Sequence, residues 1–150
     1  MEKRNLDVEE AARNGISTIY EQMPNGEFRY KLMHSGFGNV GIGIAGMHGV
    51  WQNSHYHKGV QEFMAVQEGW IAFVEMTPGG LGWIILRKGD TVISKPNIAH
   101  NVYVSAGTVF YGVKFGDIDP EKGDWYPSPE LDVLVKGMSE SEILLVGGKK

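Results

Sequence analysis

Short apolar runs, separated by turn residues such as glycine, proline and asparagine, fill the middle of the chain. Runs of this length that are rich in β-branched and aromatic residues predict strands. Their regular spacing predicts an all-β sandwich or barrel over about residues 17–116. The expected strands are Phe28–Met33, Val40–Ala45, Gln61–Val66, Trp70–Met76, Trp83–Leu86, Thr91–Ser94, Asn101–Val104 and Val109–Phe115.

Helix signals lie toward the two ends of the sequence. Asp7 can act as an N-cap with Glu10 as its capping-box partner, and Gly15 then ends a short helix over about 7–14. Ser128-Pro129 starts a second helical region, because proline is favoured at the first helical position, and we expect helices over about 129–145. The chain is therefore expected to form a single domain, 1–150, with short terminal helices outside the barrel.

Two of the runs are apolar on both faces. Trp70-Ile-Ala-Phe-Val and Trp83-Ile-Ile-Leu lack the alternation of a strand that has one solvated face. Something must cover the outside of these strands. We expect the terminal helices to cover part of it and a homodimer contact through sheet faces to cover the rest, with Trp70 or Trp83 buried by a helix or by the partner copy.

Two histidines and a glutamate lie close together in the stretch that follows Gly49. His55 and His57 are one residue apart, so on a strand both side chains point the same way, roughly 6 to 7 Å apart at Cα. Both imidazoles can then reach one metal ion. Glu62 has the opposite parity, so the chain must turn or bulge between His57 and Glu62, and Gly59 supplies the freedom to do so.

This stretch resembles the first motif of the cupin superfamily at every position. The spacing is Gly49, five residues, His55, one residue, His57, four residues, Glu62, six residues and Gly69. The match is specific, because so many fixed positions coincide. The resemblance implies a cupin-type β-barrel or jelly roll.

The second cupin motif is present in part, from Gly89 to His100, with glycine and histidine at the family's spacing. Pro96 stands one position late, and Asn97 replaces the glycine expected three residues before the histidine. Asparagine tolerates the left-handed conformation better than other non-glycine residues. Val104 stands where the family often has an asparagine, which removes a polar group from the barrel interior and weakens any inference about a particular substrate.

The resemblance implies one divalent transition metal, bound by His55, His57, Glu62 and His100. Nitrogen and oxygen ligands of this kind accept Fe, Mn, Ni, Co, Zn or Cu, so the identity of the metal stays open. Four protein ligands leave two octahedral positions, which suits a dioxygenase or a Lewis-acid isomerase or lyase. The alternative is a non-catalytic module that contains a metal and binds or senses a small molecule, because one fold hosts many functions.

Strand parity predicts the lining of a substrate pocket. If the strand runs unbroken, two residues share the face of the histidines, two follow Glu62 and two follow His100. The residues are Trp51, Asn53, Met64, Val66, Val102 and Val104. This mostly apolar lining suits a small, partly apolar molecule. The alternative is that these side chains fill the barrel. On the last strand either Tyr111 or Lys114 faces inward and could act as an acid or base.

Composition narrows the partners and the location. The formal net charge is −4 and the basic residues are scattered, so no nucleic-acid surface is expected. There is no cysteine, which excludes thiolate ligands, disulfides and a cysteine nucleophile. The first residues lack the apolar core of a leader, and no stretch is long and apolar enough to predict a membrane helix. We expect a cytoplasmic protein that binds a small molecule and does not bind a membrane.

Overall fold

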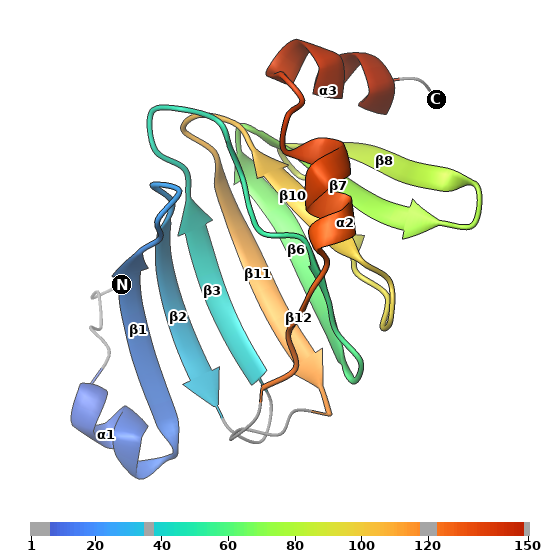
Figure 1. Cartoon of the computed structure of the whole chain (residues 1–150). Coiled ribbons are helices and arrows are strands. Elements are labelled where there is room, and N and C mark those ends of the chain that lie inside the picture. Colours follow the sequence, from blue (N-terminus) through green and yellow to red (C-terminus); the bar gives the residue numbers. More distant parts are fainter. Residues whose placement is uncertain (1–6, 35–37, 118–122, 149–150) are drawn as a thin grey trace.

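The computed structural model describes residues 7–34, 38–117 and 123–148, which form strands in two antiparallel sheets and three short helices (Figure 1). The helices are α1 Val8–Arg13, α2 Pro129–Val135 and α3 Glu140–Gly147. The strands are β1 Ile16–Gln22, β2 Phe28–His34, β3 Gly38–Ile44, β4 Val50–Trp51, β5 His55–Tyr56, β6 Val60–Glu68, β7 Trp70–Thr77, β8 Gly80–Arg87, β9 Thr91–Ile93, β10 His100–Val104, β11 Val109–Gly116 and β12 Tyr126–Pro127.

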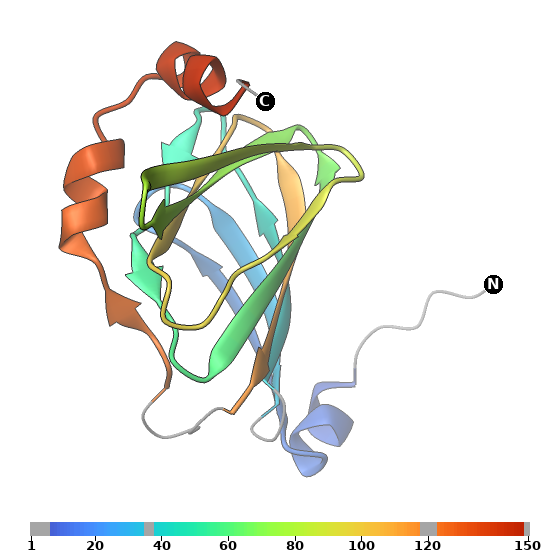
Figure 2. The ribbon, with the colours of Figure 1, turned by 90° about the vertical axis from the view of Figure 1, so that its right-hand side faces the viewer.

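The two sheets face each other and form an all-β jelly roll, which confirms the predicted fold class. The first sheet has the order β1-β2-β3-β11-β6-β9, and the second has the order β12-β5-β10-β7-β8 with β4 paired to β10. Figure 2 shows the second sheet lying across the first, with α1 and α3 at opposite ends of the barrel. Because β11 pairs with both β3 and β6, the N-terminal strands continue the sheet that carries Glu62.

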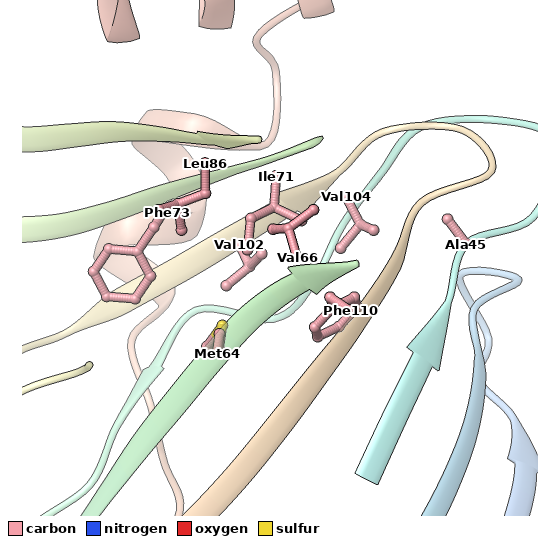
Figure 3. Packing of buried hydrophobic residues seen from close by; sticks show 9 residues of the cluster. All are labelled: Ala45, Met64, Val66, Ile71, Phe73, Leu86, Val102, Val104 and Phe110. Atoms are coloured by element: carbon pink, nitrogen blue, oxygen red, sulfur yellow. The ribbon is translucent and has the colours of Figure 1, made fainter. Parts of the chain in front are cut away.

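The space between the sheets is filled at one end by an apolar core (Figure 3). Its side chains come mainly from β6, β7, β10 and β11, where alternate residues point inward. The core residues are Ala45, Met64, Val66, Ile71, Phe73, Leu86, Val102, Val104 and Phe110. Phe73 stacks on the ring of His100 at a centroid distance of 5.5 Å, so the core borders directly on the histidine cluster.

The C-terminal helices α2 and α3 cover part of the outer face of the second sheet, as the doubly apolar strands require. On α2, Leu131 and Val135 are completely buried against Val74 of β7. On α3, Ile143 packs in a cluster with Trp70 and Trp83, so a terminal helix partly buries both indoles. None of the helices in the described ranges is long and apolar enough to span a membrane.

The helix ends follow the predicted signals in part, because only the Asp7 half of the expected Asp7–Glu10 capping box is present. The side chain of Asp7 accepts the backbone N–H of Glu10 at 2.9 Å, and Gly15 follows α1 with a φ of 70°. Pro129 is at the start of α2. The three helices therefore begin and end within a few residues of the expected positions, which lie outside the barrel strands.

Candidate metal centre

Four side chains converge between the two sheets. His55 lies on β5, His57 follows it, Glu62 lies on β6 and His100 lies on β10. One ligand atom from each lies within 4.8 Å of the others, as the motif predicts. The strand register explains part of this, because His55 and His100 are direct cross-strand partners. The three histidines are buried and Glu62 is largely so.

A tight turn brings Glu62 back to His57, and a distant carboxylate holds this turn. The side chain of Asp124 accepts backbone N–H groups from Lys58, Gly59 and Val60 at 2.8–2.9 Å. Gly59 is needed for space rather than for an unusual φ, because a Cβ there would lie 2.7 Å from the carbonyl oxygen of Asp117. The expected turn is therefore present, but its cause is a close approach of two backbone segments.

Each of the three histidines is oriented by its Nδ1 atom. In His55 and His100, Nδ1 bonds to the carbonyl oxygen two residues earlier, at 2.8 and 3.1 Å. In His57, Nδ1 bonds to the carbonyl oxygen of Asp124. Because a carbonyl only accepts, each Nδ1 carries the proton and each Nε2 keeps a free lone pair. The Nε2 atoms of His55 and His100 are buried without a hydrogen-bond partner, which is the arrangement that a metal ion satisfies.

The charge states of the cluster also suit a divalent ion. Burial lowers the pKa of His55 to about 3, with further contributions from His100 and from the Lys114 ammonium. Burial likewise lowers the pKa of His100. Burial of Glu62 opposes its ionisation, but the Lys114 ammonium, 3.4 Å away, outweighs this and holds the Glu62 pKa well below its usual range. His55 and His100 therefore offer uncharged imidazole nitrogens, and Glu62 offers an ionised carboxylate.

Lys114 is the inward-facing residue of the last long strand. Its Nζ lies 3.4 Å from Oε2 of Glu62 and 3.4 Å from Nε2 of His57. Tyr111 is on the opposite face of β11 and is 38% exposed. Because side chains alternate along a strand, the two cannot both face inward, and the sequence alone left this choice open.

A cavity of about 280 Å³ adjoins the cluster. His55, Glu62, Asn53 and Lys114 contribute to its wall, but Trp51 does not. The prediction for Trp51 assumed an unbroken strand, and it is wrong because the chain leaves regular pairing between β4 and β5. Trp51 packs instead against Trp83 and Tyr103, with ring centroids 6.1 and 5.3 Å away.

The other predicted pocket residues belong to the core. Met64, Val66, Val102 and Val104 face inward with the ligands, but they pack against one another and do not line the cavity. For these four residues the barrel-filling alternative is the observed one. The rest of the cavity wall comes from β2, β3 and β11 and from three loops. These lining residues are Met23, Glu27, Arg29, Lys31, Asn39, Gly41, Ile42, Gly43, Gln52, Phe110, Gly112 and Trp125.

The lining is consequently more charged than the sequence predicted. Arg29 and Lys31 alternate on β2 and face inward opposite Gly43 and Gly41 of β3. Glycines leave room for long side chains from the neighbouring strand. In the sequence, two alternating basic residues are followed by alternating glycines. This pattern could have indicated a charged cavity wall, but only if the pairing of β2 with β3 had been known.

Trp125 is a further site residue that sequence reasoning missed. Its ring stacks on His55 with centroids 5.5 Å apart, and it lines the cavity while remaining 49% exposed. It follows Asp124, the residue that anchors the turn after His57. Nothing in the local pattern around Trp125 distinguishes it from a surface aromatic residue, because the contact with His55 spans distant parts of the sequence.

No family model and no curated protein matches the sequence. Solved structures do match it, and one of them is the CENP-C cupin domain of Drosophila melanogaster, with a TM-score of 0.53, 14% identity and coverage of 65% of this chain and 75% of that one. The chain has the cupin fold. A capsular polysaccharide assembling protein, CapF from Staphylococcus aureus, matches with a TM-score of 0.60 and 16% identity over 73% of this chain and 31% of that protein.

A third match is a variant of oxalate decarboxylase from Bacillus subtilis, with a TM-score of 0.58 and 15% identity over 89% of this chain and 38% of that one. The chain thus spans less than half the length of CapF or of the decarboxylase. At such identities the likeness establishes the fold and leaves the activity open.

The cupin motifs also explain one unusual backbone conformation. Asn97 has a φ of 61°, and no other non-glycine residue within the described ranges has a positive φ. It occupies the position of the expected motif glycine, and its N–H donates to the carbonyl oxygen of His57 at 2.6 Å. Asparagine therefore takes over the role of glycine in the second motif, next to the metal-ligand cluster.

Proposed function

We propose that this cupin is a metal-dependent enzyme in which a divalent ion acts as a Lewis acid and Lys114 moves a proton to or from the substrate. The reaction class is isomerisation or lyase chemistry on a small carbonyl or hydroxyl compound. The observation that carries the proposal is the position of the Lys114 ammonium on the cavity wall, 3.4 Å from ligand atoms of both Glu62 and His57.

The chain supplies the parts that such chemistry needs. A bound divalent ion would polarise a substrate oxygen and stabilise the negative charge that develops on it. The imidazoles are held by their Nδ1 hydrogen bonds, so they need little reorganisation to bind. Lys114 can hold or deliver a proton beside the reacting atoms, where geometry is the first requirement of an acid or base. Trp125 stacks on His55 and lines the cavity beside it.

Two alternatives have their own support. A dioxygenase would use both octahedral positions that four protein ligands leave, for substrate and for dioxygen, and it would require a redox-active metal. A non-catalytic binding module is supported by one of the fold matches, the Drosophila melanogaster CENP-C structure bound to CAL1. Lys114 favours proton transfer over both, because neither alternative needs an ammonium group beside the ligands.

The test begins with metal analysis of protein purified without added metal. Zn(II)-loaded and Fe(II)-loaded samples are then incubated with small hydroxyketones and oxoacids in D2O, and deuterium incorporation is followed by NMR, with oxygen uptake in parallel. We expect incorporation with both metals, and its loss in Lys114→Met at unchanged metal content. Tyr111→Phe on the outer face is the control and should retain full exchange.

Three results would contradict the proposal. Undiminished exchange in Lys114→Met would exclude the proton-transfer role. Turnover that needs both Fe(II) and dioxygen would establish the oxygenase. Stable metal binding without exchange, turnover or oxygen uptake across the panel would favour the binding module.

A further inference from the structure

The cavity extends away from the metal ligands along a row of glycines. In the first sheet Lys31 is paired with Gly41, and Gly41 is paired with Gly112 of β11. A Cβ on Gly41 would lie 3.0 Å from Cγ of Lys31, and a Cβ on Gly112 would lie 3.5 Å from Oε1 of Glu62. Because these glycines have no side chains, the cavity floor, which is the inner face of the first sheet at Gly41 and Gly112, stays open between Lys31 and Glu62. The strands β2 and β6 are three positions apart in the sheet, about 14 Å between backbones.

At the far end of this floor a buried carboxylate fixes an arginine. Glu27 is fully buried, and its oxygens accept Nε of Arg29 at 2.9 Å and Nη2 of Arg29 at 3.3 Å. Nε2 of Gln52 donates to Glu27 at 3.0 Å. Arg29 lines the cavity, and among the described residues no side chain accepts a hydrogen bond from its Nη1 atom. A buried ion pair is weak evidence for stability, because burial costs each ion its hydration, so orientation of the arginine is the better explanation of Glu27.

The charge of the wall favours an anion. The lining carries three cations, Arg29, Lys31 and Lys114, against the two carboxylates of Glu27 and Glu62. A divalent ion would add to this positive excess. Lys31 has one ion-pair partner outside the cavity, Glu21 at 3.4 Å, which is 41% exposed. Exposed pairs of this kind contribute little, so Lys31 can exchange Glu21 for a ligand.

We propose that the substrate is a small oxo- or hydroxycarboxylic acid whose carboxylate is bound by Arg29 and Lys31, while its other oxygen reaches the metal ligands. This inference rests on the function proposed above and names its substrate class. Arginine suits a carboxylate because the guanidinium offers parallel N–H donors. A cavity of about 280 Å³ corresponds to about nine water molecules, so the acid has on the order of ten non-hydrogen atoms. Glu27 is a positioning residue for Arg29.

The experiment compares acids with their own amides. Pyruvate with pyruvamide and levulinate with levulinamide are titrated into Zn(II)-loaded protein, and binding is measured by calorimetry and by NMR shifts. The members of each pair have the same number of non-hydrogen atoms and differ in charge. We expect at least one acid to bind at least tenfold more tightly than its amide. Inorganic phosphate is titrated in parallel and should bind less tightly than that acid.

Variants test whether Arg29 and Lys31 of the cavity wall cause the preference for the acid over its amide. Arg29→Met alone would leave Glu27 buried without its partner, so the double variant Glu27→Gln, Arg29→Met removes both charges together. It should lose most of the preference for the acid and keep the affinity for the amide. Lys31→Met should show a smaller loss, and Lys88→Met, an exposed lysine paired with Glu68, should show none.

Several outcomes would overturn the inference. These are equal binding of acid and amide in both pairs, binding of neither member, tighter binding of phosphate, or a preference that survives in both cavity variants. The assay needs no turnover, so it separates the two proposals. A preference for the acid that depends on Arg29, without catalysis, would support carboxylate binding and contradict the enzymatic function. Turnover that does not depend on Arg29 would support the enzymatic function and contradict carboxylate binding by Arg29.

Discussion

The three histidines of the metal-ligand cluster differ in whether a nearby or a distant part of the chain orients their imidazole rings. His55 and His100 are oriented by carbonyls two residues earlier in their own segments. His57 depends on a carbonyl of Asp124, which lies 67 residues away in the sequence. The orientation of His57 is therefore set by the tertiary structure, whereas the other two carry their orientation in the local chain.

Removal of one ligand should empty the site. We expect His57→Ala to lower metal occupancy at least tenfold after dialysis, because a direct ligand is lost and the remaining three give a weaker site. His48→Ala is the matched control, since His48 is an exposed loop residue. Metal content measured by elemental analysis decides the matter, and equal occupancy in the two variants would refute the assignment.

The lowered histidine pKa values predict acid sensitivity of the metal-free protein. The folded state holds His55 neutral down to a pKa of about 3, whereas an unfolded histidine protonates near 6.5. The unfolded chain binds more protons between these values, so stability falls as the pH drops below about 6.5 and continues to fall toward 3.

Between pH 7 and pH 5 the contribution of His55 to this loss is about 2 kcal/mol. Urea unfolding at the two pH values measures it. His55→Gln, which does not titrate, should lose correspondingly less stability over the same interval. If the variant and the parent protein lose the same amount, the neutral state of buried His55 is not the cause.

At the scale of single residues, the sequence predicted the four side chains that converge in the candidate metal centre, but it did not predict most of the cavity wall. The ligands lie in motifs whose spacing is visible in the chain itself. Trp51 was misplaced because parity does not carry across the break between β4 and β5. Arg29 and Trp125 reach the cavity through strand pairing and a distant loop, and no local pattern records either contact.

Among the elements, α2 is connected to the segment that positions His55. Asp132 accepts the backbone N–H of Ser54 at 2.9 Å and the side-chain amide of Asn101 at 3.3 Å. Lys136 donates to the side chain of Asn53 at 2.7 Å. Because the carbonyl of Asn53 holds Nδ1 of His55, the helix stabilises the metal-ligand cluster without contributing a ligand.

This connection predicts a double effect for Asp132→Ala. Loss of the acceptor leaves partly buried donors unpaired, which should cost about 1–3 kcal/mol of unfolding free energy. It should also weaken metal binding on the order of tenfold, as expected for a group that supports a ligand. Chemical denaturation and competition with a metal-sensitive dye measure the two effects. Glu140→Ala on α3 is the control, and a variant that lost stability at unchanged metal affinity would show that α2 and the cluster are independent.

The elements were predicted with uneven success for a physical reason. Strands with apolar inner faces, such as β6 and β7, were found because their periodicity is strong. Ile16–Gln22 was not among the expected strands, since β1 is an edge strand whose mainly polar, partly exposed residues give no clear apolar pattern. The two-residue strands β4, β5 and β12 form only by pairing with strands from elsewhere in the chain. They are too short to show a strand pattern in the sequence.

At the scale of the whole molecule, the two sheets differ in what covers them. Helices α2 and α3 pack on the second sheet, whereas the first sheet exposes large apolar side chains on its outer face. Tyr20 and Tyr30 stack there with ring centroids 4.5 Å apart. The exposed apolar residues of this face are Tyr20, Tyr30, Leu32, Val40, Ile93 and Tyr111. A contiguous apolar face of this kind is typical of an interaction surface.

We expect a homodimer that buries this face, because the same apolar surface on two copies can meet about a twofold axis. Sedimentation of the parent protein should give a dimer. The double variant Tyr30→Lys, Val40→Lys should sediment as a monomer, because it places two charges at the centre of the contact, whereas Met47→Lys in an exposed loop should have no effect. A parent protein that sediments as a monomer at micromolar concentration would contradict the expectation.

Asp124, which holds the turn after His57, lies later in the sequence than all four candidate metal ligands. All four metal ligands have been synthesised by residue 100, but the carbonyl that orients His57 and the carboxylate that fixes its turn come later in translation. A growing chain that has just released β11 from the ribosome therefore holds every ligand in an incompletely formed site. We therefore expect tight metal binding to require the docked C-terminal segment that contains Asp124.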